Sequence, residues 1–210
     1  QLETTVGTFS AQAAGSGIYL LETNDVTVGS VTLTAQRVAS TGAAAAQTAQ
    51  SQSGLATTGN GAIVLRTDSG AITLSQALGA NGSGNVLLQA QGTAKDITAN
   101  ADISSGSGHV SVIATGTVGL GAGADIRTAG ASIDVQAGGA LTMSSTSVFE
   151  STGASAAARL LAATDVTVGD IEVAGAVSLT ATAGSVLDAD ALVSSANDAD
   201  ADVTAASLRL

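Results

Sequence analysis

The chain has 210 residues, of which 45% are hydrophobic, and it carries a formal net charge of −11 with only six lysines and arginines. So few basic side chains disfavour a nucleic-acid partner and attraction to an anionic membrane surface, since both require an extended basic surface. The absence of cysteine excludes disulfides and thiolate metal sites, and no apolar run approaches the roughly 20 residues that span a bilayer.

Alternating β-branched residues predict short strands along most of the chain. The segments DVTV at 25–28, VTLT at 31–34, IVL at 63–65, ITL at 72–74 and VSV at 110–112 follow or approach a period of two. Glycine or aspartate usually precedes the strand, because glycine permits tight corners and an aspartate side chain can accept backbone N–H groups and close a turn. The aspartates in this position are Asp25, Asp96, Asp102, Asp125, Asp165 and Asp170.

The strand motifs recur every 21 to 25 residues in three interleaved series. The first series is Ile63, Val86, Val110 and Ile133; the second is Ile72, Ile97, Val118, Leu141, Val166 and Val186; the third is Leu78, Ile103, Ile126, Val148, Ile171 and Leu192. Three series with one shared period predict an all-β chain folded as a right-handed parallel β-helix (β-solenoid), with about 23 residues and three short strands per coil.

Two alanine-rich stretches interrupt this period, STGAAAA at 40–46 and STGASAAA at 151–158. We therefore expect excursions from the rod, as short helices or loops, near residues 39–60 and 150–159. The longer excursion is the most plausible protruding binding face, but we interpret it first as a tolerated insertion without a partner. Residues 1–210 are expected to form a single β-helical segment, and the lack of a polar capping helix suggests part of a longer chain or assembly.

Few side chains remain for catalysis. The basic residues are scattered over different coils: Arg37, Arg66, Lys95, Arg127, Arg159 and Arg209. Asp102 and Asp125 occupy equivalent positions and should stack; a stacked pair could support acid–base chemistry, but we interpret both as corner caps. His109, the only histidine, has no evident nucleophilic partner and is interpreted as structural. The sequence therefore predicts no catalytic, cofactor-binding or metal-ligating residues, and no enzyme.

Calcium is the one ion with candidate ligands. Asp198, Asp200 and Asp202 alternate along one segment, and GAGAD ends at Asp125. A calcium β-roll requires tandem G-G-x-G-x-D repeats, and the ion needs a cage of six to eight oxygens. These motifs occur here once each, so we expect no cofactor, with calcium binding kept as an alternative.

Several phrases resemble the repeat regions of giant bacterial exported proteins of the filamentous haemagglutinin type. They are GAITL, GNVLLQA, GALTM, AVSLTATAGSVLDAD and ADVTAASLRL, and the resemblance in composition and period extends from about Ile18 to Leu210. It implies a right-handed parallel β-helix, export to the cell surface, and a role in adhesion, aggregation or biofilm formation. The chain lacks that family's secretion domain and any recognisable binding module.

These observations predict a structural or adhesive segment of an extracellular bacterial surface protein that forms a stiff rod or fibre. Its expected partners are further copies of itself, end to end or laterally, or a glycan or protein on a host or neighbouring cell. Two alternatives stay open. A carbohydrate-active β-helix enzyme would have a groove lined by carboxylates from adjacent coils, and a calcium-dependent binding module would be stabilised by calcium.

Overall fold

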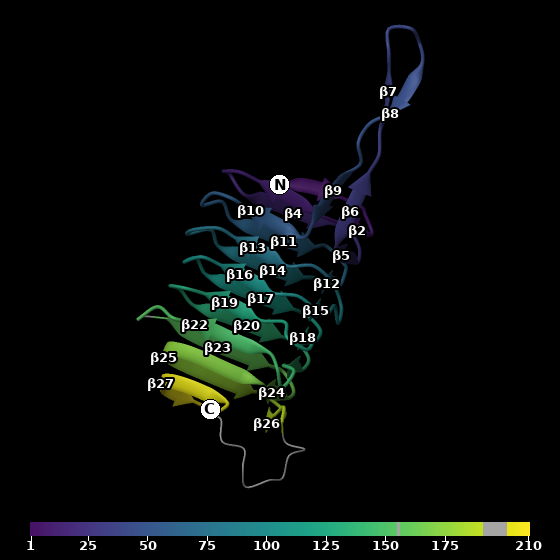
Figure 1. The fold of residues 1–210 in the computed structure, drawn as a ribbon. Helices are drawn as coiled ribbons and strands as arrows, with labels where there is room; N and C mark the ends of the chain where they lie inside the picture. Colours follow the sequence, from purple (N-terminus) through teal and green to yellow (C-terminus); the bar gives the residue numbers. More distant parts are fainter. Residues whose placement is uncertain (155, 191–200) are drawn as a thin grey trace.

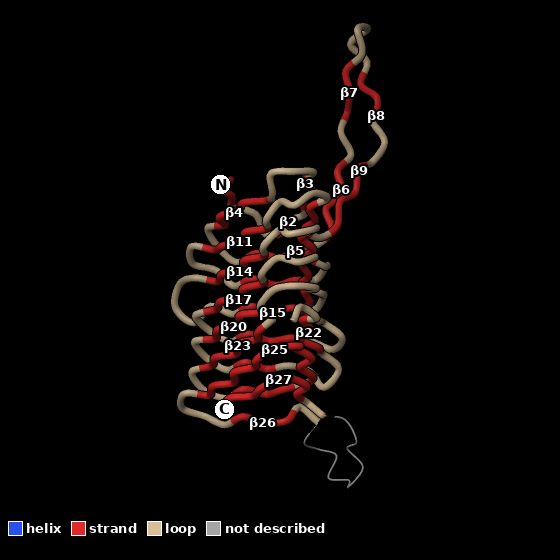
Figure 2. The backbone as a smooth tube through the Cα atoms, turned by 90° about the vertical axis from the view of Figure 1, so that its left-hand side faces the viewer, coloured by secondary structure: helices blue, strands red, loops and turns tan. Residues whose placement is uncertain are grey.

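The computed structural model describes residues 1–154, 156–190 and 201–210. In these ranges the chain is entirely β-structure, with parallel strands stacked as a solenoid of about 8 turns (Figures 1 and 2). They contain no helix, and therefore none long and apolar enough to cross a membrane. The fold class predicted from the repeat, an all-β parallel β-helix, is confirmed.

Each coil contributes one strand to each of three faces. The first face consists of β1 (Leu2–Thr4), β4 (Ile18–Glu22), β11 (Ile63–Thr67), β14 (Val86–Ala90), β17 (Val110–Ala114), β20 (Ile133–Ala137), β23 (Ala157–Ala162) and the second half of β25 (Asp170–Ala181). The second consists of β2 (Thr8–Phe9), β5 (Val26–Val28), β12 (Ile72–Leu74), β15 (Ile97–Ala99), β18 (Val118–Leu120), β21 (Leu141–Thr142), β24 (Val166–Val168) and β26 (Val186–Asp188). The third consists of β3 (Ala11–Ala13), β10 (Leu55–Thr57), β13 (Leu78–Ala80), β16 (Ile103–Ser105), β19 (Ile126–Thr128), β22 (Val148–Ser151) and the first half of β25. The last strand, β27 (Val203–Arg209), pairs with β25, which runs through a corner and joins two faces.

The predicted residue series correspond to the strand register. In the first series Ile63, Val86, Val110 and Ile133 are successive Cα partners. All six members of the second series are partners in the same way. Except for Val186, which is exposed, their side chains point inward and form one continuous aliphatic core. Burial of these branched side chains inside every coil, between the coils before and after it, provides the main driving force for folding.

The third series is confirmed for Leu78, Ile103 and Ile126, but its next member was placed one residue too early. Ile126 pairs with Phe149, which is fully buried, whereas Val148 is only partly buried. Since side chains alternate between the faces of a strand, a shift of one residue exchanges core and surface positions. The aromatic ring of Phe149 thus fills a core site for which a β-branched residue was expected.

The end of the third series also differs from the prediction. Leu192 lies outside the described residues. The strand partner of Ile171 beyond Phe149 is Val203, at the start of β27. This pairing brings the last described residues of the chain back onto the rod.

The longer predicted excursion exists, but with other bounds and another structure. Residues 30–53 form an antiparallel hairpin, in which β6 (Ser30–Leu33) pairs with β9 (Gln50–Ser53) and β7 (Gln36–Val38) pairs with β8 (Ala44–Ala46). The hairpin projects past the N-terminal end of the rod (Figures 1 and 2). The prediction of helices or loops at 39–60 was wrong, because the alternating strand at 31–34 leaves the rod and residues 55–57 have already returned to it as β10.

The second predicted excursion, near 150–159, is a lengthened corner. β22 and β23 occupy half of this stretch as regular rod strands. The core positions Phe149 and Ala158 are nine residues apart, against seven for Ile126 and Ile133 one coil earlier. The alanine-rich sequence therefore extends a turn by two residues without forming a separate element.

The register of β22 gives a direct test of the core. We expect Phe149→Ala to lower the free energy of unfolding by about 3–5 kcal/mol, because it leaves a cavity in a closely packed stack. The neighbouring Val148→Ala should change it by no more than about 1 kcal/mol, because that side chain points outward. Urea denaturation followed by circular dichroism would measure both values, and the reverse order would contradict the assigned register.

Candidate functional site

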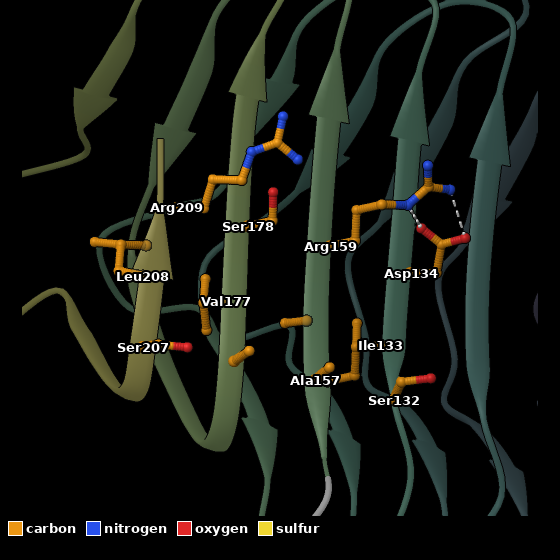
Figure 3. A pocket seen from close by; sticks show the side chains of 12 residues that line it. Ser132, Ile133, Asp134, Ala157, Arg159, Val177, Ser178, Ser207, Leu208 and Arg209 are labelled. Atoms are coloured by element: carbon orange, nitrogen blue, oxygen red, sulfur yellow. Dashed lines mark hydrogen bonds and ion pairs between the residues drawn. The ribbon is translucent and has the colours of Figure 1, made fainter.

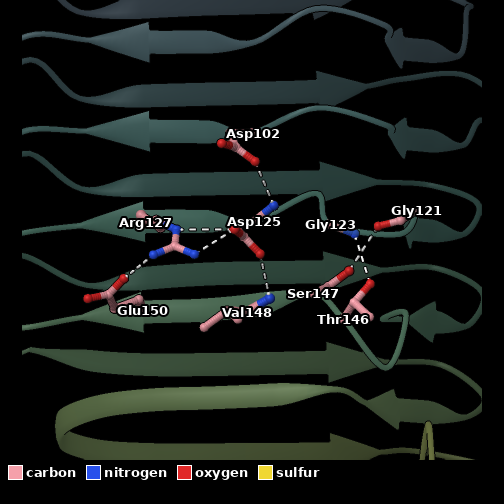
Figure 4. A network of polar contacts seen from close by, with 9 residues as sticks. All are labelled: Asp102, Gly121, Gly123, Asp125, Arg127, Thr146, Ser147, Val148 and Glu150. Atoms are coloured by element: carbon pink, nitrogen blue, oxygen red, sulfur yellow. Dashed lines mark hydrogen bonds and ion pairs between the residues drawn. The ribbon is translucent and has the colours of Figure 1, made fainter.

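The predicted corner aspartates link successive coils. Asp102 Oδ1 accepts a hydrogen bond of 3.1 Å from the backbone N–H of Asp125, and Asp125 Oδ1 accepts one of 2.8 Å from Val148 (Figure 4). From the sequence, each aspartate was expected to accept backbone N–H groups within the turn that it closes. Each carboxylate instead accepts a backbone N–H of the equivalent corner one coil later, because stacking brings that N–H group within reach. The three further pairs of this kind are Asp25 with Ala71, Asp96 with Thr117, and Asp165 with Ser185.

His109 takes the same position in another coil. Its backbone N–H donates to Asn85 Oδ1 at 2.8 Å, and its Nδ1 accepts from the backbone N–H of Ser132 at 3.3 Å. The same nitrogen lies 2.7 Å from Ser132 Oγ. A general base would need Nδ1 directed by a carboxylate or carbonyl while Nε2 faces a nucleophile. Here Nδ1 is occupied by corner bonds, so the side chain is arranged to connect coils.

Arg127, on the third face, forms ion pairs with two carboxylates. Its guanidinium lies 2.6 Å from Asp125 Oδ2 and 2.6 Å from Glu150 Oε2 (Figure 4). The hydrogen bonds that Arg127 donates to Asp125, together with the charges of Asp125 and Glu150, raise the pKa of Arg127 against the opposing effect of burial. Exposed ion pairs of this type contribute about 0–1 kcal/mol, so the arginine mainly neutralises the carboxylates of Asp125 and Glu150.

Beyond Arg127 the same outward row becomes acidic. Glu150 and Glu172 are Cα partners on β22 and β25, and both line a shallow groove that also includes Thr204. Asp170 precedes Glu172 on the same strand. Burial, and then the charges of Glu172 and Asp202, raise the pKa of Asp170. Asp170 and Glu172 thus place two interacting carboxyl groups at this end of the row, and carboxyl groups are residues that general acid–base chemistry uses.

Sequence reasoning missed this groove, although a signal was present. The third series contains DIR at 125–127 and DIE at 170–172, with the last residue of each triplet on the outward row. The carboxylate pair predicted from the sequence, Asp102 and Asp125, serves as corner caps. The pairing of Glu150 with Glu172 could be read only after the core position was moved from Val148 to Phe149.

A second groove, of about 550 Å³, lies on the first face near the end of the rod (Figure 3). Arg159 on β23 binds Asp134 through two hydrogen bonds of 2.7 and 2.9 Å. This partner raises the pKa of Arg159. Ser178 lies between Arg159 and Arg209 in the strand register, and no carboxylate in the described part of the chain forms an ion pair with Arg209. The groove therefore offers one neutralised and one available guanidinium.

The second face presents a row of threonines at the central, outward position of its strands. Stacked polar side chains of this size give a flat, uncharged surface. The row was hidden in the sequence because each threonine follows a core residue that defines the repeat. Its members in chain order, interrupted by Gly119, are Thr8, Thr27, Thr73, Thr98, Thr142 and Thr167.

The described part of the chain gives no support to the predicted calcium ligands. Asp198 and Asp200 lie outside the described residues, and Asp125 is engaged by Arg127 and Val148. Over residues 1–154, 156–190 and 201–210, no three His, Cys, Asp or Glu side chains are grouped so that they could hold a metal ion.

No protein-family model, no curated protein and no solved structure matches this chain. Three surface features are therefore candidates for function: the projecting hairpin at 30–53, the acidic groove at Glu150 and Glu172, and the groove beside Arg159 and Arg209.

The raised pKa of Asp170 leads to a pH-dependent prediction. Folding favours the protonated form of this group, so ionisation above its ordinary pKa of 3.8 costs stability in the folded protein. We expect Asp170→Asn to raise the melting temperature at pH 7. The gain should shrink as the pH falls through the raised folded pKa and should vanish below 3.8. Thermal melts of both proteins at pH 7 and pH 3 would measure this.

Asp25 is the matched control, with the opposite sign. Hydrogen bonds from the Ala71 backbone and from Lys95, with the charge of Lys95, lower the pKa of Asp25. Its ionised form therefore stabilises the fold above pH 3.8, and this contribution is lost as the pH falls through the lowered value. Asp25→Asn should lower the melting temperature at pH 7 and have a smaller effect in acid. Equal responses of the two variants would refute the assignment.

Proposed function

We propose that this chain is a structural and adhesive segment of an exported bacterial cell-surface protein, acting outside the cell. In this role the rod serves as a stiff spacer and the hairpin as the contact element. Its partners are further copies of the chain, end to end or laterally, or a glycan or protein on a neighbouring or host cell. The observation that carries the proposal is the projection of residues 30–53 beyond the rod (Figure 1).

The construction of the rod favours a mechanical role. Every coil is bonded to the next by parallel strands on three faces, and corner side chains such as Asp102 and Asp125 add further bonds between coils. Solenoids of this kind are stabilised by contacts between neighbouring repeats, so length is added without a change of design. Such a rod can hold a contact element at a fixed distance from its attachment point.

The surface of the rod favours display over adhesion along its length. The second face presents its row of threonines, and Arg127 and Arg159 are neutralised by carboxylates. The formal charge of −11 keeps such bodies apart in solution. By contrast, residues 30–53 contain a single charged side chain, Arg37, and all but Gln47 and Gln52 are exposed.

Beads that carry the purified chain test this proposal. We expect them to aggregate or to attach to bacterial cells at least about tenfold more than beads blocked with an inert protein, since many weak contacts act together. A variant in which residues 30–53 are replaced by a two-residue turn should keep the circular dichroism of the rod and lose most of the attachment. Attachment at the level of blocked beads for the complete chain would contradict an adhesive role.

The acidic groove supports a second candidate, an enzyme acting on polysaccharides. Glu150 and Glu172 are Cα partners on adjacent strands, and glycosidases use a pair of carboxyl groups that flank the scissile bond. Asp170, whose pKa is raised by burial and then by the charge of Glu172, adds a third carboxyl group on the same strand as Glu172. Carboxylates on adjacent coils support this alternative as the second candidate.

Release of reducing ends from acidic and neutral polysaccharides tests this second candidate. If the groove is catalytic, Glu172→Gln should lower the rate by about 10²–10⁴-fold, as expected for loss of an acid–base group. Glu3→Gln, on the exposed part of β1, should leave the rate unchanged. Absence of products from the whole panel, or equal rates for both variants, would remove the enzyme hypothesis.

A further inference from the structure

We propose that the hairpin is a self-docking surface, in which the open edge of β8 pairs with β8 of a second copy as antiparallel strands. This inference deepens the adhesive function proposed above, because it names a second copy of the chain as the partner of the hairpin. The hairpin edge, its side chains and its position at the end of the rod each support it.

The hairpin is held together by only two strands along its length. Residues 30 to 33 pair with 53 to 50, and residues 36 to 38 pair with 46 to 44. Between these blocks the backbone N–H of Gln47 donates to Ala35 at 2.8 Å, so the second arm contains one extra residue and forms a β-bulge. At the tip, Gly42 adopts a φ of +81°, which permits the tight turn. An isolated two-stranded hairpin is marginally stable in water, and further strands would stabilise it.

Hydrogen-bond alternation identifies the backbone groups at the open edge. The bonded pairs Ala35–Gln47 and Ala39–Ala43 lie on either side of β8. Because hydrogen-bonded and non-hydrogen-bonded pairs alternate in antiparallel strands, Ala45 bonds inward to β7. The N–H and C=O groups of Ala44 and Ala46 consequently point to the open side.

A two-fold axis through Ala45 satisfies these groups. Ala44 of one copy would lie opposite Ala46 of the other and exchange two backbone hydrogen bonds, and the reverse pair would do the same. The three alanine side chains present no bulk that would keep two such strands apart. Val38, which is 68% exposed, lies opposite Ala44 on the same face of the hairpin, and the added strand would extend this apolar face.

Charge distinguishes the two edges of the hairpin. Proteins commonly protect an exposed edge with charged residues or proline, and residues 42–53 contain neither. On the other edge, pairing of β7 with a second β7 would place Arg37 opposite Arg37, and like charges in directly opposed positions are destabilising. The arrangement therefore favours a closed dimer through β8 over an open fibre through both edges. Because the hairpin projects past the rod, two bodies of strongly negative charge would stay apart (Figure 2).

Cysteine cross-linking tests the predicted axis, and the chain offers a clean background because it contains no cysteine. In the proposed dimer the two Ala45 Cα atoms form a non-hydrogen-bonded pair about 4.5 Å apart, which a disulfide can bridge. Under mild oxidation at micromolar concentration, Ala45→Cys should form a covalent dimer at least about tenfold faster than Thr98→Cys, an exposed control on the rod. Equal rates would overturn the proposal.

Sedimentation of the cysteine-free protein provides the second measurement. We expect a concentration-dependent dimer for the natural chain and a monomer for Ala45→Lys, which would place two positive charges opposite each other at the axis. Circular dichroism should be the same for both, because the hairpin lies outside the rod core. A dimer that persists in Ala45→Lys, as end-to-end stacking of rods would produce, or a natural chain that stays monomeric, would overturn the proposal.

The two levels of the hypothesis can fail separately in the bead assay. Loss of aggregation between beads that both carry Ala45→Lys supports self-docking through β8. If those beads still attach to cells and to one another as strongly as the natural chain, the self-docking inference fails while the adhesive function stands. If the natural chain dimerises through Ala45 but its beads show no attachment or aggregation, the adhesive function fails while the inference stands.

Discussion

The rest of this structure depends on in-register parallel pairing between each coil and the next. Equivalent residues such as Ile63, Val86 and Val110 lie above one another, so every coil must present a similar outline. This requirement explains the small aliphatic core, the absence of proline and the glycines at corners. At Gly70, for example, a Cβ atom would collide with the carbonyl oxygen of Asn24 in the preceding coil. Stability and shape thus come from one repeated contact.

The same stacking limits the chemistry of the rod. Polar side chains at corners face the backbone of the next coil and become acceptors for it, as Asp102 does for Asp125. Chemistry becomes possible where the stack brings unlike or mutually repelling neighbours together. Glu150 beside Glu172 brings two carboxyl groups together, and burial, followed by the charge of Glu172, raises the pKa of Asp170 on the same strand as Glu172. Within the described residues, the hairpin strands pair only with each other and are not stacked between coils, so their outward side chains and open edges are accessible.

Much of the fold was predictable because a strand period of two and a coil period of about 23 residues are both visible in the sequence. The candidate surfaces were less accessible. The segment at 31–34 was correctly predicted as a strand, but its partner is β9 of the hairpin and not a neighbouring coil. Local sequence sets the extended conformation, whereas the choice between rod and hairpin depends on which distant strand supplies the hydrogen bonds. Similarly, placing Val148 in the core concealed the pairing of Glu150 with Glu172.

By itself, the sequence determined the architecture of this protein: three interleaved series of core residues, coils of similar length and a surface with few charges. These properties repeat along the chain, so the pattern in each coil supports the same assignment in the others. Tertiary structure alone decided where the chain leaves the rod, that Phe149 and not Val148 enters the core, and which outward side chains become neighbours. The physical reason is that such contacts join residues on different strands, and a one-residue change in register exchanges inward and outward side chains.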